Sequence, residues 1–240
     1  MIQTVKKVLK SNAFGRWLFP KVGFFWHLYK DPARRRALRK YGHSVLEEIV
    51  SIANKENLEV YPIYGTLLGF VRDGGFMKHD DDIDLAVMPG KSAKDILAVF
   101  LKYGFKYIHG LSFKGICTEF TLKHKSGLTV DFFLMQDSGR DLLSSVYFWK
   151  NGEPYTDIRQ NNLKWVRHPY VSGREVFMLE GVEVPIPKNS EDWLFYAFGK
   201  GWKVPDPNYT DASGQPGKIL VEGYGYTITC EEILNDNIPY

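Results

Sequence analysis

The first long stretch with a helical pattern of apolar residues is 31–56. Its apolar positions recur at intervals of seven, four and three residues: Leu38, Val45, Ile49 and Ile52. Such spacing places them on one face of a helix. An aspartate cap followed by a proline at the first helical position predicts that this helix starts at Asp31-Pro32. We expect the three arginines 34–36 on its solvated face, with a phosphate or lipid contact as the alternative.

Shorter segments alternate with the two-residue period of strands or carry hairpin turns. The expected strands are 58–63, 82–88, 105–108, 116–124 and 128–135. A turn at Lys125–Gly127 predicts that the last two form a hairpin. Asn151-Gly152 and Glu180-Gly181 predict two more hairpins. Helices are expected at 93–103 after Ser92, and at 191–198 before Gly199.

With 240 residues and 44% hydrophobic content, the chain is long enough for one large domain with appendages. We divide it into an N-terminal arm (1–30), a catalytic domain (31–207) and a C-terminal tail (208–240). The tail is rich in proline, glycine and asparagine, which is typical of an extended segment, although Tyr224, Tyr226 and Ile228 could still pack.

Basic residues gather at the N-terminus. Residues 1–45 hold 11 of the 31 Lys/Arg residues and only one of the 28 Asp/Glu residues. Mixed with the aromatic residues of segment 17–29, they are typical of a segment on an anionic membrane surface. The alternative is that the aromatic residues pack on the body of the protein. Because the basic residues lie in the arm rather than beside the acids, we expect no nucleic-acid partner.

The densest concentration of charge lies directly before an apolar strand. Asp80, Asp81, Asp82 and Asp84 fall within five residues, and Leu85–Val87 follows. In a strand, Asp82 and Asp84 share one face, and Asp80 joins them if the extended backbone begins early enough. Carboxylates one strand step apart can hold a hard cation, Mg²⁺ or Mn²⁺, that keeps positions for water and substrate phosphate.

A turn upstream of these acids offers a place for the phosphates of a substrate. Gly65-Thr66, a small residue followed by a hydroxyl cap, predicts a helix N-terminus with free N–H groups. Arg72 at the end of the following segment can add a bidentate phosphate contact. Lys78 can steady the same phosphates or pair with the aspartates.

Asp131 is a lone acid in the apolar segment 128–135. A buried carboxylate without a partner is costly, so we expect either an ion pair with a lysine or arginine, or a role beside Asp82 and Asp84. In the second case it is a third metal ligand or a general base, brought there by adjacent strands.

Three segments together resemble the LicD/fukutin family of phosphotransferases. They are GTLLGFVRDGGFMKHDDDIDLAV (65–87), VDFFLM (130–135) and VPIPKNSEDWLFYAFGKGWKVPDP (184–207), within a resemblance that spans about 45–207. His79 and Lys78 stand where the family often has tryptophan and proline. The zinc-binding cysteines of some animal relatives are absent.

The resemblance implies an α+β protein with a DNA-polymerase-β-type nucleotidyltransferase fold, a small mixed sheet with flanking helices and extra β-hairpins. It implies transfer of a substituted phosphate, such as phosphocholine or ribitol phosphate, from a CDP-linked donor to a glycan. By position, Asp82, Asp84 and Asp131 would be metal ligands and Asp80 a further acid. Gly65, Thr66 and Arg72 would sit by the donor phosphates.

Several alternatives stay open. The general base is Asp131 or Asp80. A nucleotidyltransferase that moves NMP from an NTP to a small hydroxyl acceptor, and a non-catalytic glycan- or nucleotide-binding module, are rival functions. With no apparent secretory signal, no span of about 18 apolar residues and only two cysteines, we expect a cytoplasmic protein. If its acceptor is a lipid-linked glycan, the arm would hold it at the inner membrane face.

Overall fold

A computed structural model describes residues 13–148, 150, 155–206 and 215–240, with side chains in the first helix described from Pro32 onward. Its main sheet has ten strands in the order β1-β2-β5-β4-β3-β12-β8-β7-β6, with β11 paired to β8. A separate pair, β9 and β10, forms a two-stranded sheet. All strand pairs among the described residues are antiparallel except β2–β5.

The elements have the following bounds. The strands are β1 (Val60–Pro62), β2 (Ile83–Val87), β3 (Lys106–Phe113), β4 (Ile116–Lys123), β5 (Thr129–Leu134), β6 (Gln136–Asp137), β7 (Leu142–Phe148), β8 (Gln160–His168), β9 (Arg174–Leu179), β10 (Val182–Pro187), β11 (Lys218–Leu220) and β12 (Gly225–Ile228). The helices are α2 (Ala13–Lys55), α3 (Tyr64–Leu68), the π-helix η1 (Gly69–Asp73), α4 (Ala93–Lys102), α5 (Ser190–Phe198) and α6 (Cys230–Leu234).

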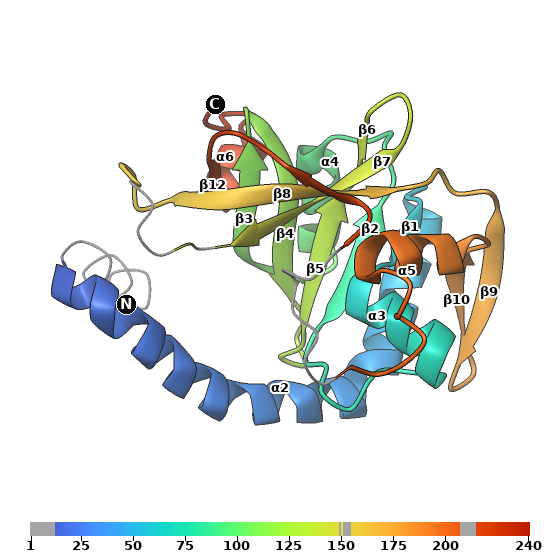
Figure 1. The fold of residues 1–240 in the computed structure, drawn as a ribbon. Coiled ribbons are helices and arrows are strands. Elements are labelled where there is room, and N and C mark those ends of the chain that lie inside the picture. The colour runs from blue at the N-terminus through green and yellow to red at the C-terminus, as the bar shows by residue number, and fades with distance from the viewer. Residues whose placement is uncertain (1–12, 149, 151–154, 207–214) are drawn as a thin grey trace.

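Helix α2 is longer than the sequence predicts. It runs without a break from Ala13 to Lys55, so the expected start at Asp31-Pro32 is wrong. A proline inside a helix removes one backbone hydrogen bond and bends the axis without always ending the helix, and α2 is visibly curved in Figure 1. The four predicted apolar positions of 31–56 are all buried, where α2 lies against β2 and β10.

The other predicted elements are largely confirmed. Helix α4 begins after Ser92, whose side chain accepts a hydrogen bond from the Asp95 N–H. β4 and β5 pair as the expected hairpin. β9 and β10 pair across Glu180-Gly181, both with positive φ, as the favoured two-residue hairpin turn requires. β7 and β8 also pair, whereas the turn predicted at Asn151-Gly152 lies outside the described residues.

The core lies where α4 covers the centre of the sheet. The Phe132 ring of β5 lies 4.5 Å from Phe100 of α4 and 5.4 Å from Phe120 of β4, measured between centroids. All three side chains are fully buried. Burying an aromatic side chain contributes about 1.5–3 kcal/mol, so this cluster fixes β5 against β4 and holds the end of β2 beside it.

The C-terminal segment is not an extended tail. Residues 218–234 form β11, β12 and α6, and β12 is inserted between β3 and β8 within the main sheet. A Cβ at Gly225 would lie 2.8 Å from the Ser112 carbonyl oxygen and would overlap the Tyr147 ring. Only glycine therefore lets β12 approach this closely.

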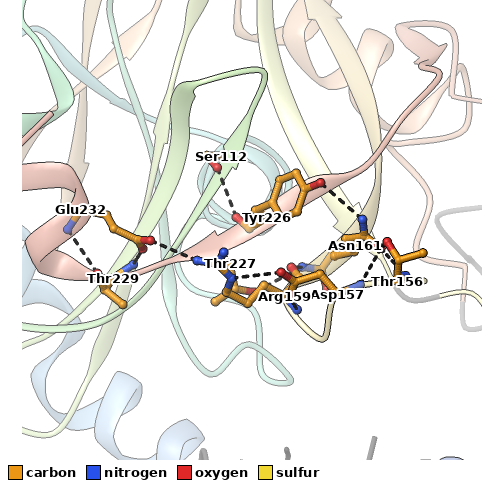
Figure 2. A network of polar contacts seen from close by, with 10 residues as sticks. Ser112, Thr156, Asp157, Arg159, Asn161, Tyr226, Thr227, Thr229 and Glu232 are labelled. Atoms are coloured by element: carbon orange, nitrogen blue, oxygen red, sulfur yellow. Dashed lines mark hydrogen bonds and ion pairs between the residues drawn. The ribbon is translucent and has the colours of Figure 1, made fainter. Parts of the chain in front are cut away.

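Polar contacts hold this last strand in place, as Figure 2 shows. The Thr227 N–H donates to the Arg159 carbonyl at 2.9 Å, and the Asn161 amide donates to the Thr227 hydroxyl at 3.2 Å. Arg159 also pairs with Glu232 at 3.0 Å, and Thr229 and Glu232 form the capping box of α6. These contacts join residues far apart in sequence, which is why the local sequence pattern of this segment did not predict its place in the sheet.

The division of the chain into arm, catalytic domain and tail stays a prediction.

Candidate active site

Asp84 and Asp131 lie opposite each other on neighbouring strands. β2 runs parallel to β5, and the register pairs Asp84 with Asp131. Side chains paired in this way stand on the same face of a sheet. The expectation that adjacent strands bring Asp131 to the aspartate cluster is therefore confirmed. Asp82, one residue before β2, shares the strand parity of Asp84.

Thr66 holds strand β2 rather than capping a helix. Helix α3 begins at Tyr64, with Ile63 at the N-cap position and no side-chain cap. The predicted cap at Thr66 is therefore wrong. The Thr66 side chain is buried, and its hydroxyl accepts a hydrogen bond from the Asp84 N–H at 2.9 Å. This contact ties the turn to the acid-bearing strand.

Gly65 lies directly beside the acids. A Cβ at this position would be 3.6 Å from Asp80 Oδ1 and 3.6 Å from Asp84 Oδ2, so the glycine leaves a space that any side chain would fill. Asp80 belongs to the same cluster, and its Oδ2 atom is buried with no hydrogen-bond partner in the described part of the chain. Together they form an acid-lined recess at the turn.

Glu119 is a carboxylate of this cluster that sequence reasoning missed. It lies on β4, two residues from Thr121, which pairs with Asp131. Its side chain is only 9% exposed. Two residues along a strand share a face, so Glu119 stands on the same side of the sheet as Asp131. The available signal in the sequence was that Glu119 and Thr121 are two residues apart and so share one face of a strand. It points to the acid cluster only once β4 is known to pair with β5.

Mutual repulsion and burial shift the pKa values of these carboxyls upward. Burial, followed by the negative charges of Asp131 and Asp81, raises the pKa of Asp82 to about 7. Burial also raises the pKa of Asp84 and Glu119 well above their usual values, with neighbouring acids adding to the shift. The pKa values of Asp80 and Asp131 rise as well, mainly through burial. The surroundings therefore do not compensate the negative charge that full ionisation of the cluster would create.

Arg34 of α2 forms ion pairs with two of the aspartates. Its Nη2 lies 3.0 Å from Asp82 Oδ2 and 2.8 Å from Thr129 Oγ1, and its Nε lies 3.2 Å from Asp81 Oδ2. The expectation that Arg34 lies on the solvated face is wrong, because the acid cluster lies against this turn of α2. Asp81 and Asp82, which are neighbours in sequence, thus both pair with Arg34.

A cavity of about 1100 Å³ opens beside the cluster. Asp84 and Glu119 are the two cluster carboxylates that line it, and Gly65 lines it too. Asp82 and Asp131 do not line it. Further lining residues come from β3, β7 and the segment after α5: His109, Tyr147, Lys200 and Trp202. The cavity is therefore lined by carboxylates together with aromatic and basic side chains.

The three predicted basic or polar neighbours of the acids differ in position. Arg72 lines the cavity but pairs with Asp73 at 2.8 Å, and this pairing raises the pKa of the guanidinium. His79 also lines the cavity, with Nε2 3.8 Å from Asp80 Oδ1. Lys78 is exposed and does not line it. Donor contacts by Arg72 and Lys78 stay predictions.

A short line of hydrogen bonds connects Asp131 to the cavity. Thr121 donates its hydroxyl proton to Asp131 Oδ1, and His109 Nε2 lies 3.4 Å from the same hydroxyl oxygen. Because Thr121 has a single proton, His109 must be the donor in that second contact. Hydrogen bonds through Thr121 of β4 and His109 of β3 thus link Asp131 to the cavity.

The sequence motifs and this geometry agree with one comparison. The family described as LicD/FKTN/FKRP, nucleotidyltransferase domain, matches residues 57–189, more than half of the chain. The chain belongs to this family. The match includes β2, β4 and β5, and thus all the carboxylates described above. A search of curated proteins gave no match.

Membership in the LicD family indicates a phosphotransferase that acts on glycans. The observed fold is a mixed α/β arrangement with a mostly antiparallel sheet and flanking helices. Within the described residues, no helix is both long enough and apolar enough to cross a membrane.

The donor set fits a hard divalent cation, because it consists of carboxylates and contains no cysteine. The buried Asp80 oxygen without a partner and the raised pKa values support the same conclusion. Nevertheless, no three His, Cys, Asp or Glu side chains of the described part of the chain are already arranged around one cation position. A cation shared by Asp82 and Asp84 would have to displace Arg34 from Asp82.

Proposed function

We propose that this LicD family member transfers a substituted phosphate, such as phosphocholine or ribitol phosphate, from a CDP-linked donor to a glycan hydroxyl. The pairing of Asp84 with Asp131 beside a cavity of about 1100 Å³ carries the proposal. The DNA-polymerase-β-type nucleotidyltransferase fold is part of it. The parallel β2–β5 pair, which places acids from two strands on one face, supports that fold.

A divalent cation, Mg²⁺ or Mn²⁺, would be held by Asp82, Asp84 and Asp131. When bound, such a cation neutralises the donor diphosphate and the charge that develops on the leaving CMP. The protein keeps these three carboxylates in place through the β2–β5 register and the Thr66–Asp84 hydrogen bond. Arg34 would release Asp82 when the cation and donor enter.

The donor phosphates would lie at the turn that precedes the acids. Gly65 lies next to Asp84 and has no side chain, so a phosphate can approach its backbone closely. Arg72 lines the cavity and can turn its guanidinium from Asp73 to a phosphate oxygen. Thr66 acts through Asp84, and Lys78 would reach the phosphates from the surface.

The acceptor hydroxyl must lose its proton as it attacks phosphorus. Asp131 is better connected than Asp80 for this task, because Thr121 and His109 link it to the cavity. Among the described residues, Asp80 Oδ2 is buried without a hydrogen-bond partner, and His79 Nε2, 3.8 Å from Oδ1, is beyond hydrogen-bond distance. Asp131 would thus take up the proton and Asp80 would add negative charge near the cation.

The cavity has room for the donor and part of the acceptor. Small-molecule sites typically measure about 300–1,000 Å³, and this cavity is larger. Tyr147 and Trp202 give one wall apolar surface against which a sugar ring can lie. A glycan or lipid-linked glycan acceptor would therefore approach past these two residues.

The direct test is a screen of CDP-choline, CDP-ribitol and CDP-glycerol with Mg²⁺ and candidate glycans, with CMP release as the readout. Metal-dependent CMP release supports the proposal. Release of pyrophosphate from an NTP would instead support transfer of NMP to a small hydroxyl acceptor. Nucleotide binding by calorimetry with neither product would support a non-catalytic binding module.

We also propose a peripheral position at an anionic membrane surface for this protein. The excess of basic residues in 1–45 supports it. Residues 1–12 of the arm lie outside the described residues, and the side chains of 13–30 are not described. Packing of the arm's aromatic residues on the body is therefore the alternative that the flotation experiment in the Discussion distinguishes.

A further inference from the structure

The edge strands of the two sheets differ in how well they are protected from further pairing. An edge strand presents unpaired N–H and C=O groups, and proteins block such edges with short strands or proline. The edges of the main sheet are short, because β1 has three residues and β6 has two. The small sheet has two edges of six residues each. Its strand β10 contains Pro185 and Pro187, whereas β9 contains no proline.

The register of the hairpin decides which backbone groups of β9 point outward. Leu179 and Val182 flank the two-residue turn and lie opposite each other, and in a turn of this kind the flanking residues form a hydrogen-bonded pair. Bonded and non-bonded pairs alternate along an antiparallel ladder. The N–H and C=O groups of Val176 and Met178 therefore point away from β10. Pro185 lies opposite Val176, at an outward position of β10 where a missing N–H is tolerated.

The side chains at these outward positions of β9 are exposed as well. Val176 is 53% exposed and Met178 is 55% exposed. Phe177 between them points to the other face, where its ring stacks on Phe70 with the centroids 4.7 Å apart. Within the described residues, only β10 pairs with β9, and β9 lies at the right-hand margin of the molecule in Figure 1. The protein thus presents an apolar strand edge without a partner strand in the described part of the chain.

The sequence of this edge is complementary to itself. Two copies of β9 can pair in antiparallel orientation about a two-fold axis, provided that their outward backbone groups meet. With the axis through Phe177, Val176 of each copy lies opposite Met178 of the other, and Arg174 lies opposite Glu180. Moving the axis to Val176 places Arg174 opposite Met178, and moving it to Met178 places Glu180 opposite Val176. The first register alone among these three matches charge with charge and apolar residue with apolar residue.

Both charged groups are available for such a contact. Arg174 is exposed, and its side chain forms no hydrogen bond or ion pair with another described residue. The Glu180 side chain is 73% exposed, although its carboxylate lies 3.5 Å from His43 Nδ1. Opposite charges that face each other across a strand pair stabilise the pairing, and like charges destabilise it. The register through Phe177 is therefore favoured at both of its ends.

We propose that β9 pairs with β9 of a second copy of this chain, in the register centred on Phe177. The two hairpins then form one four-stranded sheet across a symmetric dimer. A single strand pair makes a small interface, so the dimer forms reversibly as the protein concentration rises. None of the described residues that line the main cavity belongs to β9, so the dimer leaves both cavities open. This inference goes beyond the proposed function and does not depend on it.

Sedimentation velocity of the full-length protein at increasing concentration tests the dimer. The wild type should change from monomer to dimer. Val176→Pro removes one outward N–H from each copy without removing a bond to β10, and Met178→Asp places a charge in the apolar contact. Each should weaken the dimer by about tenfold or more. Leu220→Asp, at a 71% exposed position of β11, is the matched control and should dimerise as the wild type does.

Charge reversal tests the register. Arg174→Glu and Glu180→Arg should each weaken the dimer, because like charges then lie opposite each other at both ends of the strand pair. The variant with both substitutions restores opposite charges and should dimerise nearly as well as the wild type. A double variant that dimerises no better than the two single variants would overturn the proposed register.

Two further results would overturn the proposal as a whole. One is a wild type that stays monomeric at every concentration. The other is a dimer that neither Val176→Pro nor Met178→Asp weakens, because its contact then lies elsewhere, for example in the arm. Circular dichroism and the melting temperature show whether each variant is folded. Should Val176→Pro unfold the hairpin, Met178→Asp and the charge-reversal variants, which keep the β9 backbone unchanged, decide the question.

Discussion

The Thr66 hydroxyl accepts a hydrogen bond from the Asp84 backbone N–H at 2.9 Å, across 18 residues of chain. Replacing Thr66 with valine keeps the shape of the side chain but leaves that N–H without a partner. We expect Thr66→Val to lower the free energy of unfolding by about 1–3 kcal/mol, measured by urea denaturation. Thr66→Ser keeps the hydroxyl and should lose clearly less. Equal losses in both variants would show that the methyl group matters and the hydrogen bond does not.

The raised pKa values predict an unusual dependence of stability on pH. The folded-state pKa of Asp82 is about 7, above its ordinary value of 3.8, so the folded protein binds more protons than the unfolded chain between those values. Stability therefore falls as the pH rises through this window. The metal-free melting temperature should decrease from about pH 4 to about pH 7, and Asp82→Asn should flatten part of that slope. A melting temperature that rises over this range would contradict the assigned shifts.

Arg34 should set where this transition lies. Its positive charge lowers the pKa of Asp82 and Asp131 against the upward effects of burial. In Arg34→Gln, the loss of stability should therefore extend to higher pH than in the wild type. The melting temperature of the metal-free protein as a function of pH checks this. Arg34→Lys retains the charge and should behave more like the wild type. Identical curves for all three proteins would show that Arg34 does not influence the pH dependence of stability.

The acid-bearing strands could be predicted from sequence because their signals are local. The alternation of Asp82 and Asp84 before an apolar run, and the lone Asp131 in another apolar segment, gave both strands and the expectation that they meet. Glu119 could not be found in the same way. Its strand looks like an ordinary amphipathic strand until the register places Thr121 opposite Asp131.

Most errors in the predicted elements came from contacts distant in sequence. Asp31-Pro32 has the composition of a helix start, but α2 runs through it from Ala13 to Lys55, because a proline bends a helix without always ending it. Thr66 has the composition of a cap, but its hydroxyl is used by the backbone of β2. The C-terminal residues look like a tail, yet Gly225 allows β12 to enter the sheet beside Ser112. Local propensity does not report any of these partners.

The arm gives a prediction that does not depend on catalysis. Full-length protein should float with liposomes that contain anionic lipid and should not float with neutral liposomes, because the basic residues are attracted to negative headgroups. A variant with Lys6, Lys7 and Lys10 replaced by glutamine should float less. Equal flotation of the variant and the wild type, or none by either, would favour packing of the arm on the body of the protein.

The central claim is that Asp84, paired with Asp131 across β2 and β5, supports metal-dependent transfer from a CDP-linked donor. The most direct measurement is CMP release by Asp84→Asn beside the wild type, at matched Mg²⁺ and with the best donor and acceptor found in the screen. Turnover should fall by about a hundredfold or more, since the cation's charge stabilisation amounts to several kcal/mol, while the melting temperature shows that the variant is folded. Near-wild-type CMP release by folded Asp84→Asn would contradict the account.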